Sequence, residues 1–135
     1  MSVFVDTSAL YALLDADDIG YELVRPAWDK GIDDGEGFLT TNYVVLETTA
    51  LTQRRLGVAA VRTLVDEILQ MVDVHWVTDA DHELGLQSLL TAGRRRLSFV
   101  DCVSFAVMRR REIGQYLGLD SHFDEQGFTR YAPSV

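Results

Sequence analysis

Short apolar segments alternate with helical patterns along this chain, and this alternation restricts the possible folds more than any other feature. Apolar runs of strand length lie at residues 3–6, 37–41, 73–78, 116–119 and, as a weaker candidate, 129–131. Helical spacing of apolar residues covers 7–15, 21–31, 43–56, 58–71, 79–92 and 99–113. Strands that alternate with helices predict an α/β domain with a mostly parallel sheet.

The size of the chain suits one domain over residues 1–135, with 47% hydrophobic residues to form a core. Cys102 is the single cysteine, so no internal disulfide forms, which fits a reducing compartment. We find no signal peptide and no apolar run of the roughly 18 residues that a membrane span needs. These observations predict a soluble, cytoplasmic protein that does not contact a membrane.

The charge balance is acidic, with a formal net charge of −9 and a pI of about 4.6. This balance argues against a protein that coats nucleic acid. The positive charge is nevertheless grouped, at residues 54–55, 94–96 and 109–111, and every one of these residues is arginine. Arginine forks bind phosphate well, while charge runs are also common on solvated helix surfaces, so both interpretations of the arginine groups stay open.

Carboxylates occupy the positions where an α/β protein places its ligands. In open α/β sheets, ligands bind outside the carboxyl ends of the strands. Asp6 ends the first expected strand and Asp120 ends the fourth. Glu47 lies one turn into the helix after the second strand, and Asp101 lies in the first turn of the helix at 99–113. We therefore expect these four acids to converge.

Converging carboxylates repel one another, and their pKa values rise unless a cation neutralises them. Mg²⁺ prefers oxygen ligands, and such a metal polarises a phosphodiester and lowers the pKa of an attacking water. The pattern thus predicts a metal-dependent nuclease. The spacing of the histidines indicates no zinc site.

Each acid also has a structural explanation. Asp6, with Thr7 and Ser8 after it, is a candidate helix cap, and Ser98 with Asp101 has the spacing of a capping box. Glu47 also fits an exposed helical position, and Asp120 fits the start of a turn. These explanations do not predict that all four acids gather at one sheet edge. His122, two residues after Asp120, fits packing at a helix start or in a loop, with contact to the substrate as the alternative.

Four segments in order resemble the PIN-domain family, and especially its small VapC-like toxins of toxin–antitoxin pairs. The segments are V-F-V-D-T-S-A-L at 3–10, T-T-N-Y-V-V-L-E at 40–47, L-S-F-V-D-C-V-S-F-A-V-M-R-R at 97–110 and L-D-S-H-F-D-E-Q-G-F at 119–128. The resemblance covers nearly the whole chain. It implies an α/β/α sandwich with a central sheet of four to five strands, and a Mg²⁺- or Mn²⁺-dependent endoribonuclease.

The resemblance also implies roles for particular residues. By position, the acidic metal-binding and catalytic core is Asp6, Glu47 and Asp101, with Asp120 as the more variable fourth acid. The hydroxyl that supports the first aspartate or touches substrate corresponds to Thr7 or Ser8, and Ser98 matches the small hydroxyl residue before the third acid. Gly118 departs from the family pattern, which often has threonine there. Asp124 is an alternative to Asp120 at the fourth position.

For partners, the resemblance implies an RNA substrate, a homodimer and a cognate antitoxin whose C-terminal segment blocks the acidic site. Two alternatives within the fold are an RNA-processing nuclease without an antitoxin and an inactive interaction module. A phospho-accepting receiver domain also gathers aspartates around Mg²⁺. That class needs a paired aspartate after the first strand and a lysine after the last, whereas the only lysine here is Lys30.

Overall fold

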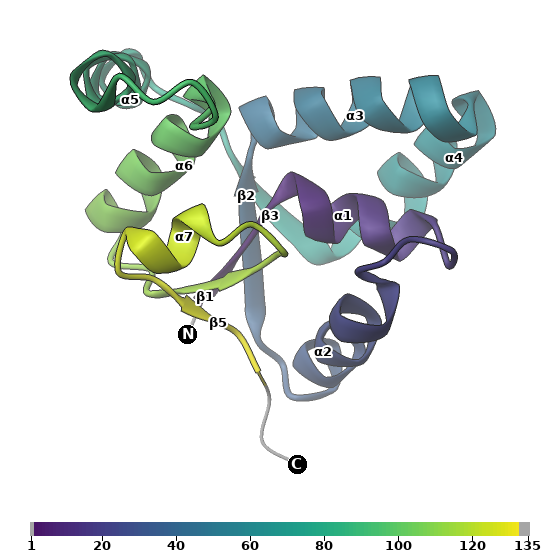
Figure 1. Ribbon diagram of the computed structural model, residues 1–135. Coiled ribbons are helices and arrows are strands. Elements are labelled where there is room, and N and C mark those ends of the chain that lie inside the picture. The colour runs from purple at the N-terminus through teal and green to yellow at the C-terminus, as the bar shows by residue number, and fades with distance from the viewer. Residues whose placement is uncertain (1, 133–135) are drawn as a thin grey trace.

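The computed structural model describes residues 2–132, and its strands and helices alternate in the predicted order. The strands are β1 (Ser2–Val5), β2 (Gly37–Thr41), β3 (Val72–His75), β4 (Gln115–Leu117) and β5 (Thr129–Arg130). The helices are α1 (Thr7–Leu14), α2 (Tyr21–Asp33), α3 (Asn42–Leu56), α4 (Val58–Thr63), α5 (Asp79–Ala92), α6 (Phe99–Arg110) and α7 (His122–Glu125). The sheet runs through the middle of the molecule, with α1 and α2 on one side and α5 and α6 on the other (Figure 1).

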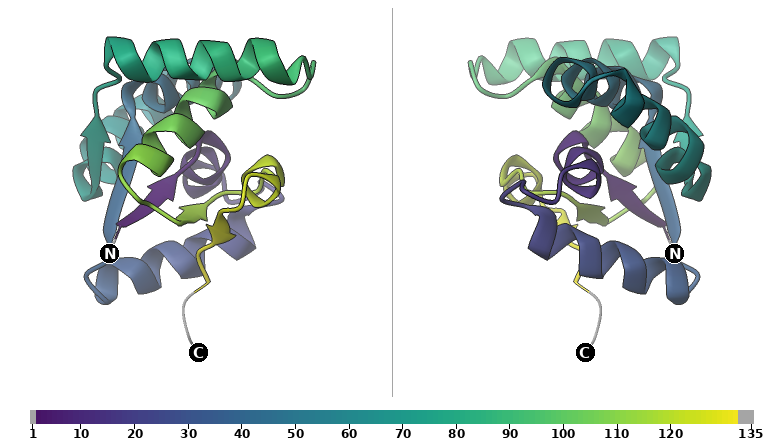
Figure 2. Two further views of the ribbon diagram at one scale, coloured as in Figure 1. Left: turned by 90° about the vertical axis from the view of Figure 1, so that its left-hand side faces the viewer. Right: turned by 90° about the vertical axis from the view of Figure 1, so that its right-hand side faces the viewer.

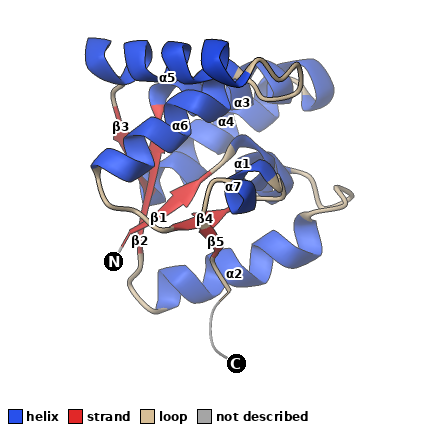
Figure 3. Cartoon of the chain, turned by 60° about the vertical axis from the view of Figure 1, so that its left-hand side comes forward, coloured by secondary structure: helices blue, strands red, loops and turns tan. Residues whose placement is uncertain are grey.

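The five strands form one sheet in the order β3-β2-β1-β4-β5, and every pairing is parallel. The prediction of a mostly parallel sheet of four to five strands is confirmed. The chain first moves outward from β1 to β2 and β3, then returns to the other side of β1 to form β4 and β5 (Figure 3). This reversal places a topological switch point between β1 and β4, where α/β proteins open a crevice at the carboxyl ends of the strands.

The core lies on both faces of β1, whose residues Val3, Phe4 and Val5 are fully buried. Strands covered on both faces read as continuous apolar runs rather than alternating ones, as this strand does. On the side of α6, the rings of Tyr116 and Phe123 stack with centroids 4.7 Å apart. Cys102 is also buried there, as expected for a packing role. Within residues 2–132, no helix combines the length and apolarity needed to cross a membrane.

Two strands end earlier than the sequence predicts. β4 ends at Leu117, so Asp120 does not end a strand but lies in the turn before α7, where its Oδ1 accepts a hydrogen bond from the backbone N–H of His122 (2.9 Å). β3 ends at His75, because the next residues have other partners. The N–H of Val77 donates to Asn42 Oδ1 (2.7 Å), and Thr78 caps α5.

The predicted helix at 58–71 is also interrupted. After α4 the chain continues as a π-helical turn at Leu64–Ile68 and a 3-10 turn at Leu69–Met71. Figure 2 shows α3 and α2 at opposite ends of the molecule, with α1 between them. The apolar spacing identified helical backbone correctly, but it carries no information on which hydrogen-bond ladder the backbone adopts.

Candidate active site

A hollow of about 370 Å³ opens at the switch point and brings all of the predicted site residues together. They come from β1–α1, α3, the start of α6 and the turn before α7. The residues are Asp6, Thr7, Ser8, Glu47, Ser98, Asp101 and Asp120. The convergence expected from sequence is therefore present in the structure.

Asp6 occupies the N-cap position of α1, but its side chain makes no capping hydrogen bond. The backbone carbonyl of Asp6 accepts from the N–H groups of Ala9 and Leu10 instead, both at 3.1 Å. The residue is only 5% exposed, and its carboxylate accepts a hydrogen bond from Ser8 Oγ (3.2 Å). Burial, followed by the charge of Asp101, raises the pKa of Asp6 to about 7. Helix capping thus does not account for this side chain.

Asp101 is held in the first turn of α6, where its backbone N–H donates to Ser98 Oγ (3.0 Å). Ser98 is the N-cap of this helix, as its spacing predicts. The Asp101 carboxyl group lies in the hollow, and burial together with the charge of Asp120 raises its pKa to about 6. The cap therefore also positions a site carboxylate.

Asp120 and Asp101 face a third side chain, His122. The Nδ1 atom of His122 lies 3.1 Å from Asp120 Oδ1 and 3.9 Å from Asp101 Oδ2. One ligand atom from each of these three side chains lies within 4.8 Å of the other two. The sequence favoured packing for His122 over contact with the substrate, and did not identify it as a candidate metal ligand. The signal available was its position two residues after Asp120, and a single histidine in a turn is too common to be selected on that basis.

Glu47 is an exposed residue of α3, yet it borders the hollow and accepts a 2.6 Å hydrogen bond from Thr7 Oγ1. Thr7 is 8% exposed, so the bond is shielded on the threonine side. The hydrogen bond links the start of α1 to α3. It fixes the direction of Glu47, the most exposed of the four site carboxylates.

Asp124 does not join this group. Its Oδ1 accepts a hydrogen bond from the hydroxyl of Tyr116 (2.9 Å), and it does not line the hollow. The alternative that Asp124 replaces Asp120 is therefore not supported by the structure.

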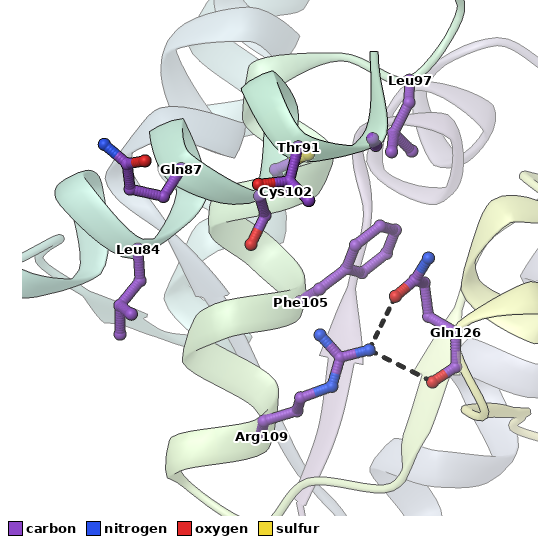
Figure 4. Close-up of a pocket in the computed structure, with 10 residues that line it drawn as sticks. Leu84, Gln87, Thr91, Leu97, Cys102, Phe105, Arg109 and Gln126 are labelled. Carbon is purple, nitrogen blue, oxygen red and sulfur yellow. Dashed lines mark hydrogen bonds between the residues drawn. The ribbon is translucent and has the colours of Figure 1, made fainter. Parts of the chain in front are cut away.

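The arginines at 109–111 have partners within the fold. Arg109 Nη2 donates to the side chain of Gln126 (2.7 Å) and to its carbonyl (3.3 Å), as Figure 4 shows. Arg110 is paired with the buried Asp81, and Arg111 Nη1 lies 3.2 Å from His75 Nδ1. Arg109 and Gln126 border a second hollow, of about 400 Å³, but none of the four acids lines it. This second hollow is separate from the acidic site.

The donor set of the acidic hollow fits a divalent cation. Among residues 2–132, none of the four acids forms an ion pair with lysine or arginine. The raised pKa values of Asp6 and Asp101 show that the protein alone does not balance their charge. Carboxylate oxygens are the ligands that hard divalent ions prefer.

Comparison with known proteins agrees with this geometry. Residues 3–129 match the family described as PIN domain, and the chain belongs to this family. A relative from two Mycobacterium tuberculosis strains, described as the 23S rRNA-specific endonuclease VapC20, is 34% identical over 132 residues, which cover 97% of this chain and 98% of the relative. The predicted resemblance to PIN-domain, VapC-like endoribonuclease toxins is confirmed.

Solved structures give the same result. The crystal structure of Mycobacterium tuberculosis VapC20, described as a sarcin-ricin loop cleaving toxin, has a TM-score of 0.83 and 32% identity, and the match covers 94% of this chain and 96% of that one. PAE2754 from Pyrobaculum aerophilum has a TM-score of 0.66 at 18% identity, covering 97% of this chain and 90% of that one, and shares the fold.

Proposed function

We propose that this protein is a Mg²⁺- or Mn²⁺-dependent endoribonuclease toxin whose site is the acidic hollow. The observation that carries the proposal is Asp6, a buried carboxyl group at a helix N-cap that does not cap the helix and faces two further aspartates. A buried charge without a partner is costly to the fold. A bound divalent cation would neutralise the carboxylate charges and so remove this cost.

In this proposal Asp6, Glu47, Asp101 and Asp120 hold the metal and form the catalytic group. A divalent ion bound there polarises the phosphodiester and lowers the pKa of the attacking water. Three hydroxyl residues, Thr7, Ser8 and Ser98, border the same space. Thr7 orients Glu47, Ser8 orients Asp6, and Ser98 sets the position of Asp101 through the helix cap. We propose that these three hydroxyl residues also contact the RNA substrate.

We further propose ribosomal RNA as the substrate, because the relative with near-complete coverage in both chains is described as specific for 23S rRNA. A cognate antitoxin is supported by the acidic hollow on a chain of net charge −9, which suits a basic peptide segment. The proposal includes a homodimer, action in the cytoplasm and one domain over residues 1–135. The unpaired, buried thiol of Cys102 fits such a reducing compartment.

The test is cleavage of labelled 23S rRNA and of a hairpin that contains the sarcin-ricin loop, with unrelated RNAs as a specificity panel. Reactions contain Mg²⁺, Mn²⁺ or EDTA, and the Asp6→Asn variant is the control. We expect cleavage with either metal and none with EDTA or with the variant. Cleavage by a folded Asp6→Asn protein, or cleavage in EDTA, contradicts the proposal.

A metal titration separates the active enzyme from an inactive interaction module. We expect Mg²⁺ to raise the melting temperature of the wild-type protein and to leave that of Asp6→Asn unchanged, because only the native site binds the ion. An unchanged wild-type melting temperature favours the interaction module.

A further inference from the structure

Besides Glu47, one wall of the acidic hollow carries residues that the metal chemistry does not use. On α3, Glu47, Leu51 and Arg55 follow one another at intervals of four residues, and all three line the hollow. Residues spaced by four lie on one face of a helix. The eight steps from Glu47 to Arg55 span about 12 Å at about 1.5 Å per residue. The wall therefore extends well beyond the carboxylates.

Arg55 is a fixed cation at the far end of this wall. Its guanidinium lies over the ring of Tyr11, 5.4 Å from the centroid, and the hydroxyl of Tyr11 donates to Asp15 Oδ2 (3.0 Å). Among residues 2–132, Arg55 forms no ion pair with a carboxylate. Its charge is thus held in place without being neutralised. An arginine that is pre-organised on an aromatic ring loses little freedom when it binds phosphate.

Ile19 stands on the same rim and is 95% exposed. Single exposed apolar residues are common, but the loop that presents Ile19 is firmly held. Asp18 Oδ2 accepts from the N–H of Gly20 (2.9 Å), and Asp18 N–H donates to the carbonyl of Asp15 (2.9 Å). Gly20 packs so closely on Leu119 that an added Cβ would lie 2.2 Å from Leu119 Cδ1.

We propose that Arg55 and Ile19 form a binding rim for the RNA strand. Arg55 binds a phosphate that flanks the scissile one, and Ile19 packs against an unstacked base. The inference rests on the proposed ribonuclease function, because the acids define which phosphate is cleaved. Apolar side chains of this kind insert at unstacked bases in nucleic-acid complexes, and single-stranded loops are the RNA elements that expose such bases. The rim also explains how a protein of negative net charge binds RNA, because the RNA contacts a local positive charge rather than the whole surface.

The test measures RNA binding apart from cleavage, in an Asp101→Asn background that leaves the RNA intact. The probe is a labelled hairpin that contains the sarcin-ricin loop, followed by fluorescence anisotropy at several salt concentrations. We expect Arg55→Ala to weaken binding by about tenfold and to reduce the salt slope by about 0.7, the value for one phosphate of a single strand. Arg54→Ala is the matched control, since Arg54 is exposed but does not line the hollow. It should change neither quantity.

For Ile19 we expect Ile19→Ala to weaken binding about threefold without changing the salt slope, because no charge is lost. Leu23→Ala is its control, since Leu23 is an exposed leucine outside the hollow. With the native acids in place, Arg55→Ala should raise KM and leave kcat nearly unchanged. If both rim variants of an active enzyme keep the wild-type affinity and KM, the proposed rim is wrong and the ribonuclease proposal stands. If the wild type binds the RNA tightly through Arg55 but does not cleave it, the ribonuclease proposal is wrong and the proposed rim stands.

Discussion

Gly118 lies directly against Asp6. A Cβ added at Gly118 would be 3.1 Å from the Cβ of Asp6 and 3.2 Å from Ser8 Oγ. The position that departs from the family pattern thus has little space for a side chain here. Ser8 supplies a hydroxyl at this point instead: its Oγ donates to Asp6 Oδ2 (3.2 Å) and accepts from the N–H of Leu119 (2.9 Å). The absence of threonine at 118 therefore does not leave Asp6 without a hydroxyl partner.

This contact predicts that Gly118→Ala weakens the enzyme without unfolding it. The new methyl group pushes on Asp6 by a few tenths of an ångström, and small displacements of catalytic groups have large effects on rate. We expect roughly a tenfold loss of cleavage rate, measured on the same RNA hairpin. Gly114→Ala is the matched control, because a Cβ at Gly114 meets nothing within 4 Å. Equal activities for the two variants would show that Asp6 does not need this close packing.

The hydrogen bond from Thr7 to Glu47 gives a second prediction. Thr7→Val keeps the shape of the side chain but removes the donor of the 2.6 Å bond, so Glu47 loses its fixed direction. We expect a loss of about 1 kcal/mol in the free energy of unfolding and a several-fold lower affinity for Mg²⁺, read by isothermal calorimetry. Thr7→Ser retains the donor and should stay close to the wild type in both measurements. Metal affinity that is unaffected by Thr7→Val would remove Glu47 from the metal site.

The four acids were predictable from sequence because their positions depend on local patterns. Asp6 follows an apolar strand directly, and Asp101 follows a serine N-cap, so strand periodicity and capping rules place both at the sheet edge. The partners of Arg110 and Asp124 were not predictable, because Asp81 and Tyr116 reach them only through tertiary packing. A run of arginines has no sequence period that indicates which of its side chains pair with residues of the fold.

The ends of the elements were also beyond local rules. β4 stops at Leu117 because its ladder with β1 ends where Leu117 pairs with Val5, while β5 pairs with it only through Gln115 and Tyr116. The length of a strand depends here on a neighbour that lies elsewhere in the chain. The turn after β4 likewise depends on tertiary packing. It brings Asp120 to the hollow, although Asp120 lies three residues beyond the end of the strand.

The raised pKa values predict how the stability of the metal-free protein depends on pH. Burial and the neighbouring aspartates raise the pKa of Asp6 to about 7 in the folded state, from the ordinary value of 3.8. The protonated form is therefore favoured by folding. The stability from this group is fully present below pH 3.8 and is lost as the pH rises through about 7, at about 1.4 kcal/mol per pKa unit.

The measurement is the difference in melting temperature between wild type and Asp6→Asn, in EDTA, from pH 4 to pH 8. We expect the wild type to lose stability relative to the variant across this range, because asparagine has no proton to release. Mg²⁺ should restore the wild type most strongly above pH 7, where protons no longer compete for the carboxylates. Two parallel curves would mean that Asp6 is already balanced by the protein itself.

Asp81 provides the opposite case, a buried carboxylate whose role is structural. It is 0% exposed, accepts from His75 Nε2 (2.9 Å) and the N–H of Thr78 (3.1 Å), and lies 2.6 Å from Arg110 Nη2. Burial alone would raise its pKa, but the hydrogen bonds from His75 and Thr78 and the charge of Arg110 lower it. The cluster joins the end of β3, the start of α5 and the end of α6, away from the acidic hollow.

We therefore predict that Asp81→Asn destabilises the fold but spares the metal site. The expected loss is about 3 kcal/mol, the lower end for a broken buried ion pair, because the Arg110 side chain is still 48% exposed. Asp79→Asn, at an exposed position of the same helix turn, should have little effect. The lowered pKa means that the stability from Asp81 is present above its ordinary pKa of 3.8 and is lost as the pH falls below it. The gap between wild type and Asp81→Asn in urea unfolding should thus close in acid. A change in Mg²⁺ affinity in folded Asp81→Asn would contradict the separation of the two carboxylate groups.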